Sequence, residues 1–339
     1  MKQQIHNEAE EVKTAKAPKP DPAMEAAQAG EPLFVQTATA VRPPAWKRKA
    51  QKAMTVVSPY AMVFPAMVFL LVFVIYPAIN MVYLSFFNYN LISDKKFIGW
   101  QNYRRLFFVS LDFTNALKNT AIYTVVTLVL LIFFGLIFAL WLQNDSRINS
   151  LAQRVMFLPH ICAMLSVAMI FQWLMDDEGL FNAVLGFFSL PALRWLNSSA
   201  TSLLSVIIVN LWKNSGYYAL ILLSSLKAIP PEINEAAALD DAGRFQKFFK
   251  ITLPMLSPQI FFLVVTITIG SFKVFDSVRI LTGGGPGDSS DVLVLYIYRY
   301  AFGNMQIGYA SAAGTILLII LLILTYFYFK SMDRKVHYQ

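Results

Sequence analysis

A short polar face interrupts one of the apolar runs of this sequence and is the first place where chemistry could occur. Asn210, Asn214 and Tyr217 lie four and three residues apart within the run 202–226, so they share one face of a helix. Carboxamide and hydroxyl groups exchange hydrogen bonds with a polyhydroxylated ligand, and an aromatic ring packs against its apolar side. The face is therefore suited to a sugar or polyol. The same residue types also hold transmembrane helices together, so the spacing leaves both interpretations open.

Other polar groups inside apolar runs allow similar alternatives. His160 follows Pro159, and its ring either faces a ligand or bonds a backbone carbonyl that the proline frees. Lys213 either extends to the membrane–water interface or faces a cavity, where it would favour an anionic solute. We find no paired carboxylates, metal-ligand spacing or activated nucleophile, which predicts that the chain is not an enzyme. The single cysteine, Cys162, excludes an internal disulfide.

The apolar residues around these groups are clustered in runs long enough to cross a bilayer. Hydrophobic residues make up 57% of the chain and charged residues 14%, a composition that few soluble domains share. Apolar runs of about 18 or more residues with few charges indicate transmembrane helices. We therefore predict an all-α integral membrane protein with spans at 59–84, 117–142, 155–175, 202–226, 257–278 and 308–330.

The N-terminal segment differs from the rest of the chain and bears on its orientation. Residues 1–53 are rich in Ala, Glu, Lys, Pro and Gln and lack an apolar period, which predicts a disordered tail whose basic end could be attracted to anionic lipid. So long a polar stretch before the first apolar run argues against a cleaved signal peptide. Lys and Arg residues are more numerous on the N-terminal side of the membrane. The positive-inside rule thus predicts that both termini are cytoplasmic.

Residues 227–256 form a charged, helix-prone segment between two strongly apolar runs. The two prolines at 230–231 suit the first turn of a helix, and the alanines that follow favour its middle. Gly243 could end this helix with a positive φ, and a second helix is expected over 244–252. By itself, the pattern also fits an ordinary amphipathic loop at the membrane interface.

The charged segment resembles the EAA loop of ABC-importer permeases. It carries Glu-Ala-Ala at 235–237, a later glycine, and Ile-x-Leu-Pro at 251–254, in the expected place before the fifth span. The stretch 275–287, ending in Gly-Gly-Gly-Pro-Gly, is similar to the carbohydrate branch of this family, the relatives of the maltose transporter's larger permease. The chain departs from the pattern at 240–242, where Asp-Asp-Ala replaces the Asp-Gly-Ala of many relatives. The resemblance covers about 55–335.

The resemblance implies a fold, a set of partners and two groups of site residues. The fold would be a six-span type I importer permease over 54–335, whose coupling loop at 227–256 fits a cleft of an ATPase subunit. A second homologous permease, two ATPase subunits and an extracytoplasmic solute-binding protein would complete the importer. The implied ATPase-coupling residues are Glu235, Ala236, Ala237, Asp240, Gly243 and Pro254. The residues aligned with the sugar-contact region are His160, Met164, Asn210, Asn214, Tyr217 and Ser271.

The expected function is import of a carbohydrate, meaning a mono- or oligosaccharide or a related polyol, by alternating access across the bacterial cytoplasmic membrane. The sequence has no Walker motif, so ATP and Mg would bind to the partner ATPases and this chain would hold no cofactor. An anionic solute such as a glycerophosphate or a uronate is the alternative. A secondary carrier is disfavoured because the spans hold almost no acidic residues near the membrane midplane.

Overall fold

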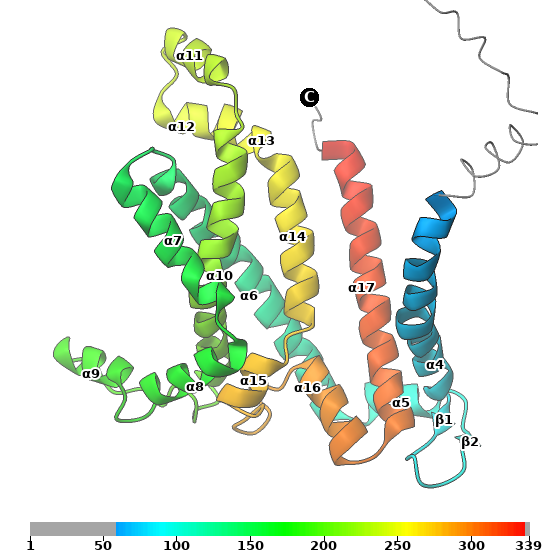
Figure 1. The fold of residues 1–339 in the computed structure, drawn as a ribbon. Coiled ribbons are helices and arrows are strands. Elements are labelled where there is room, and N and C mark those ends of the chain that lie inside the picture. Colours follow the sequence, from blue (N-terminus) through cyan, green and yellow to red (C-terminus); the bar gives the residue numbers. More distant parts are fainter. Residues whose placement is uncertain (1–58, 336–339) are drawn as a thin grey trace, which may run out of the picture. The chain divides into compact units, whose positions relative to one another are not determined.

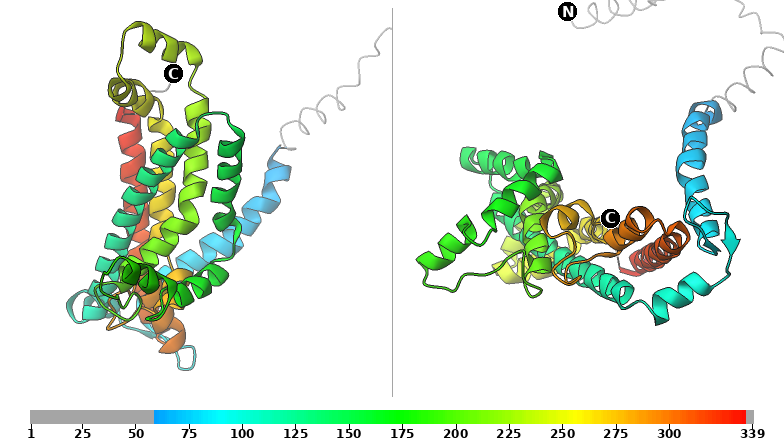
Figure 2. Two further views of the ribbon diagram at one scale, coloured as in Figure 1. Left: turned by 90° about the vertical axis from the view of Figure 1, so that its left-hand side faces the viewer. Right: turned by 90° about the horizontal axis from the view of Figure 1, so that it is seen from below.

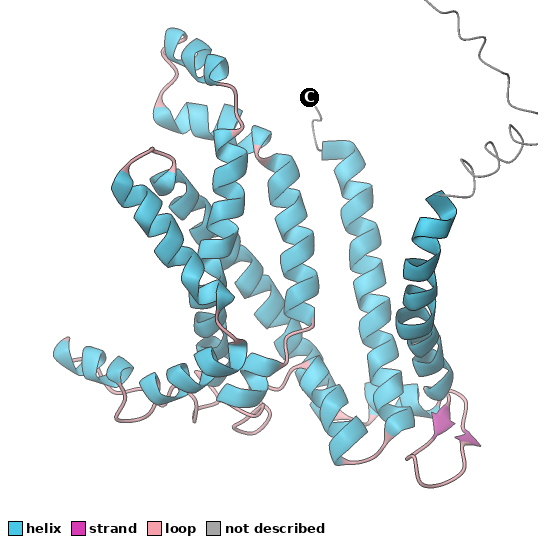
Figure 3. Ribbon diagram, viewed as in Figure 1, coloured by secondary structure: helices cyan, strands magenta, loops and turns pink. Residues whose placement is uncertain are grey.

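The structure, a computed structural model, describes residues 59–335, and their regular structure is almost entirely helical (Figure 3). The predicted tail at 1–53 lies outside the described residues. Among residues 59–335, four helices are long and apolar enough to cross a membrane singly. They are Pro59–Leu84, α6 (Leu111–Leu142), α10 (Ser202–Lys227) and Ile307–Lys330 within α17 (Ile307–Lys335).

Two further spans are each formed by a bent pair of helices. α7 (Arg147–Ile161) and α8 (Met164–Leu174) meet at 98°, and Arg244–Met255 meets α14 (Ser257–Phe272) at 64°. Counting each pair once gives the six predicted spans.

The third span, predicted at 155–175, is broken into two helices in the structure. The chain leaves α7 at Cys162 and Ala163, whose ψ angles of 140° and 137° are extended rather than helical. In the fifth span, predicted at 257–278, the helix α14 stops at Phe272 instead of continuing to 278.

The centre of the bundle is the packing of α6 against α10, with α7 and α14 alongside (Figure 1). Lipid is as apolar as leucine, so the hydrophobic effect does not drive transmembrane helices together. Close van der Waals contact and hydrogen bonds hold them instead. Leu131, Leu222 and Leu263 fill one buried cluster, and Tyr123 and Val206 belong to another. Helix α10 approaches α7 closely at Gly216, where an added Cβ would lie 1.9 Å from the carbonyl oxygen of Met156.

The first span ends in α4 (Tyr76–Leu84), which packs against α17. A π-helical segment, η1 (Leu71–Ile75), comes directly before it. Pro77 stands in the first turn of α4. Proline has no N–H to donate and its ring crowds the preceding turn, which accounts for a local change of helix type at this point.

Short elements close the end of the bundle opposite α11 (Figures 1 and 2). They are the antiparallel pair β1 (Phe87–Asn88) and β2 (Lys96–Phe97), then α5 (Gln101–Phe108), α9 (Leu180–Phe187), α15 (Asp276–Leu281), α16 (Leu293–Tyr298) and η3 (Arg299–Gly303).

An ion-pair cluster fixes the turn between α15 and α16. Arg299 donates to Asp288 at 2.9 Å and also to Asp291, whose side chain is fully buried. Asn119 of α6 donates from Nδ2 to the backbone carbonyls of Asp288 and Asp291, each at 3.0 Å. At Gly284 φ is +92°, and a Cβ would come within 3.2 Å of the Asp291 carboxylate. The glycine is therefore needed for both its φ and its small size.

Candidate functional site

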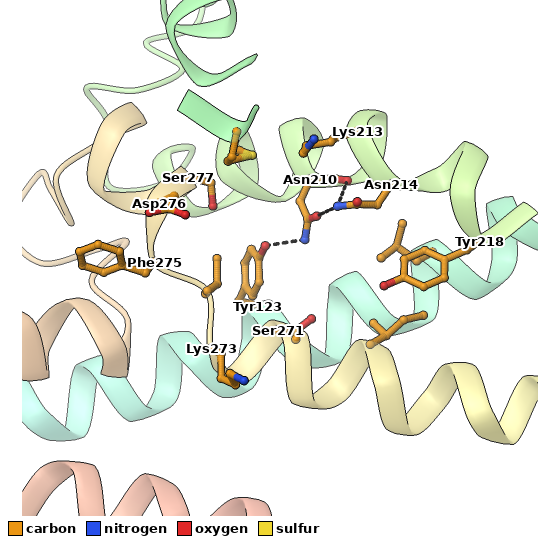
Figure 4. Close-up of a pocket in the computed structure, with 15 residues that line it drawn as sticks. Tyr123, Asn210, Lys213, Asn214, Tyr218, Ser271, Lys273, Phe275, Asp276 and Ser277 are labelled. Atoms are coloured by element: carbon orange, nitrogen blue, oxygen red, sulfur yellow. Dashed lines mark hydrogen bonds between the residues drawn. The ribbon is translucent and has the colours of Figure 1, made fainter. Parts of the chain in front are cut away.

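A pocket of about 270 Å³ opens between the spans at the end of α14 (Figure 4). α6 and α10 form two of its walls, and the chain from Gly270 to Ser277, which includes the break between α14 and α15, forms a third. Its polar lining consists of Tyr123, Asn210, Lys213, Asn214, Tyr218, Ser271, Lys273, Asp276 and Ser277.

A chain of hydrogen bonds joins three helices beside this pocket. Asn210 donates from Nδ2 to the Tyr123 hydroxyl at 2.5 Å, and the Nδ2 of Asn214 donates to the Asn210 carbonyl at 3.2 Å and to its side-chain oxygen. His160 Nδ1 lies 3.0 Å from Asn214 Oδ1. A carboxamide oxygen can only accept, so this contact requires the His160 tautomer with a proton on Nδ1. This chain of hydrogen bonds orients the side chains of Asn210 and Asn214 toward the pocket.

The six predicted solute-pathway residues fall into two groups. Met164, Asn210, Asn214 and Ser271 line the pocket. His160 and Tyr217 lie behind it, where their rings stack with centroids 4.1 Å apart and an interplanar angle of 3°. His160 therefore supports Asn214 from behind the lining, and Tyr217 packs toward α7. The role of these residues in binding a solute stays a prediction.

Lys213 lines the pocket, as one of the two sequence-based alternatives predicted, but its ammonium group is bonded to backbone carbonyls. Its Nζ donates to the backbone carbonyls of Pro159, His160 and Cys162, at 3.1, 3.0 and 2.5 Å. The last carbonyls of a helix lack partners within the helix, and here one ammonium group satisfies three of them. This contact explains how α7 can end inside the bundle and turn by 98° into α8. It also occupies the three protons of the ammonium group.

Two aromatic residues of the pocket were missed in the sequence. Tyr123 is buried in α6 with its hydroxyl bonded to Asn210, and Tyr218 lines the pocket in place of the predicted Tyr217. Tyr123 could have been noticed, because it lies on the same helical face as the small polar residues Thr120 and Thr127. Choosing between Tyr217 and Tyr218 requires the rotation of α10, and spacing fixes that only coarsely.

The predicted coupling segment forms the two expected helices at the other end of the bundle. α11 (Pro231–Leu239) is followed by a continuous helical stretch made of α12 (Arg244–Lys247), η2 (Phe248–Thr252) and α13 (Leu253–Met255). α11 lies beyond the ends of the spans (Figure 1).

The prediction that Gly243 ends the first helix with a positive φ is wrong. Asp241 takes that conformation, with φ of +52°, and Gly243 has φ of −59° and precedes α12. Asp241 and Ala242 donate backbone hydrogen bonds back into the last turn of α11, at 3.2 and 3.0 Å. These two bonds are the Schellman pattern that usually has glycine at the left-handed position. Aspartate tolerates this region better than most residues, which explains why the turn forms without a glycine there.

Most of the predicted coupling residues are open to a partner. Glu235, Ala236, Asp240, Gly243 and Pro254 are exposed, and Ala237 is buried within the chain. Leu239, at the end of α11, is 87% exposed.

The pocket and the coupling segment belong to a chain that resembles known transport proteins. Residues 131–338 match the family described as "Binding-protein-dependent transport system inner membrane component". The chain belongs to this family. It is similar to the probable ABC transporter permease protein YurN of Bacillus subtilis (strain 168), with 41% identity over 77% of this chain and 90% of YurN. It is also similar to the trehalose/maltose transport system permease protein MalF of Thermococcus litoralis, with 29% identity over 79% of this chain and 91% of that protein.

A solved structure confirms the fold of this permease. It is the bacterial alginate ABC transporter in complex with an alginate pentasaccharide-bound periplasmic protein, matched with a TM-score of 0.73 and 25% identity over 84% of this chain and 97% of that chain. The predicted ABC-importer permease family and the type I six-span fold are thereby confirmed.

Proposed function

We propose that this permease carries a carbohydrate into the cytoplasm and that the solute passes through the pocket in Figure 4. One observation carries the proposal. A cavity between the spans is lined by hydrogen-bonding groups of Asn210, Asn214 and Ser271 beside the rings of Tyr123 and Tyr218. Groups that exchange hydrogen bonds, next to aromatic faces, suit a hydroxyl-rich solute. The MalF relative, named for trehalose and maltose, supports a sugar.

The movement would come from partner subunits that grip α11. In this proposal an ATPase subunit covers Leu239 and the exposed face around Glu235, which places α11 and both termini on the cytoplasmic side. ATP and Mg²⁺ bind to the ATPases, and this chain has no catalytic role. A second permease and an extracytoplasmic solute-binding protein complete the importer. The periplasmic protein bound to the alginate transporter supports a partner of this last kind.

The structure removes the first argument for an anionic solute, which was the charge of Lys213. Lys213 was the residue expected to favour an anionic solute, but its ammonium group bonds three backbone carbonyls. The other cation of the lining, Lys273, is matched there by one carboxylate, that of Asp276. A neutral carbohydrate therefore fits the lining better than an acidic one.

Uptake kinetics test the proposed pathway. The probe is a labelled sugar that stabilises the solute-binding protein in a thermal-shift screen, and uptake is measured in proteoliposomes that hold the whole importer. Asn210→Ala removes a side chain from the lining, and we expect KM to rise roughly three- to tenfold, the equivalent of one lost hydrogen bond.

Thr266→Val is the matched control. Thr266 is a polar residue of the same bundle that is exposed and bonds the Phe262 carbonyl at 2.9 Å, outside the pocket. Sugar uptake by the Thr266→Val importer should equal that of the unmodified importer. Unchanged KM in Asn210→Ala, or a binding protein that no sugar stabilises, would count against the proposal.

A further inference from the structure

A second, larger hollow lies near α11 and shares no residue with the solute pocket. It is a groove of about 1190 Å³ between the end of α6, the end of α10 and the α12–η2 stretch. Pockets for small molecules usually measure about 300–1,000 Å³, so this groove has room for a larger ligand. It lies where the apolar spans α6 and α10 end, next to the polar residues Gln143 and Asn144.

The walls of the groove are apolar and partly aromatic. Phe133 and Ile137 of α6 are 54% and 43% exposed, and Phe249 of η2 is 60% exposed. Phe245 and Phe248 continue this wall on the other side. In a bilayer these side chains at the end of a span contact hydrocarbon rather than water.

The rim of the groove is positively charged without a counter-charge. Arg244 and Lys247 line it, and no acidic residue does. Neither cation forms a salt bridge within residues 59–335. Asp145, which follows the end of α6, pairs with Lys227 at 2.5 Å. An occupant that brings negative charge to this rim and hydrocarbon to the walls satisfies both parts of the groove.

We propose that this groove binds one anionic phospholipid. The acyl chains lie along Phe133, Ile137 and the η2 phenylalanines, and the phosphate sits between Arg244 and Lys247. A guanidinium group binds phosphate through two parallel hydrogen bonds, and cations at headgroup depth attract anionic lipid. A helix of a partner chain would have to bring acidic side chains to pair the two cations, and the crosslink described below distinguishes it from lipid. The lipid site goes beyond solute transport and lies between α6 and the segment that continues from α11.

Native mass spectrometry of the intact importer tests this site. The purified complex is titrated with palmitoyl-oleoyl phosphatidylglycerol and, separately, with the phosphatidylcholine of the same chains. We expect the unmodified complex to prefer phosphatidylglycerol. Arg244→Gln with Lys247→Gln should reduce that preference by roughly fivefold for each removed charge.

Two matched double variants make the result specific. Lys95→Gln with Lys96→Gln removes the same charge at the opposite end of the bundle, where both lysines are exposed, and should leave the preference unchanged. Arg244→Lys with Lys247→Arg keeps the charge and should retain it, which separates loss of charge from misfolding. Equal preference in the unmodified and the Gln variants overturns the proposal. So does a crosslink from Ile137 that captures a partner subunit instead of lipid.

Discussion

The contact between α7 and α10 yields a sharp test of the packing, through Gly216→Ala. A Cβ at Gly216 would lie 1.9 Å from the backbone carbonyl oxygen of Met156 and 2.5 Å from its carbonyl carbon. Both atoms belong to the backbone, so no side chain can rotate away. An ordinary contact of about 3.4 Å would require the two helices to separate by about 1.5 Å at this point.

The expected cost follows from opposing effects. Overpacking of this kind costs about 1–3 kcal/mol, and alanine returns about 1 kcal/mol through its higher helix propensity. Separation of the helices also stretches the His160–Asn214 bond and the three Lys213 bonds that join the same helices. A typical hydrogen bond contributes about 1 kcal/mol. If about two of these four bonds break, the net loss is about 2–4 kcal/mol.

The assay is thermal unfolding of the purified importer, followed by loss of its size-exclusion peak, together with sugar uptake. Gly186→Ala is the control, because Gly186 is an exposed glycine of helix α9 outside the solute pocket, and a Cβ added there would have no neighbour within 4 Å. That variant should be neutral or more stable by up to about 1 kcal/mol. Gly216→Ala should unfold several degrees lower and transport poorly. If both variants behave alike, the inferred close approach of α7 and α10 is incorrect.

Three further outcomes are expected. Asp241→Gly should stabilise the turn after α11 by about 1 kcal/mol, since glycine relieves the cost of φ +52°, and slower proteolysis of that turn would show it; faster cleavage would contradict it. Burial raises the pKa of Asp291 to about 6, against the opposing charge of Arg299. The folded-state pKa is above the unfolded one, so the contribution of Asp291 is full below about pH 4 and is lost as pH rises through 6; between pH 5 and 7 the loss is about 1 kcal/mol. Asp291→Asn should remove that dependence, and a difference in melting temperature from wild type that is equal at pH 5 and pH 7 would refute it. Leu239→Asp should reduce co-purification of the ATPase at least tenfold, because burying a leucine contributes about 1.5–3 kcal/mol; undiminished recovery would show that the ATPase binds elsewhere.

The sequence by itself determined the spans and the coupling segment. Span existence depends on the length of an apolar run, which is a local property. α11 begins at Pro231 as predicted, because proline preference and alanine propensity also act locally. The shared helical face of Asn210 and Asn214 followed from their spacing in the same way.

Only the tertiary structure decided which side chains meet. The rotation of α10 against α7 is set where Gly216 meets Met156, and it directs Tyr218 rather than Tyr217 toward the pocket. The same packing brings Lys213 to the carbonyl groups at the end of α7 and permits the bend into α8. These residues are more than 50 positions apart in the chain. Hydropathy and spacing describe each helix separately, whereas such contacts depend on the distance and rotation between two helices.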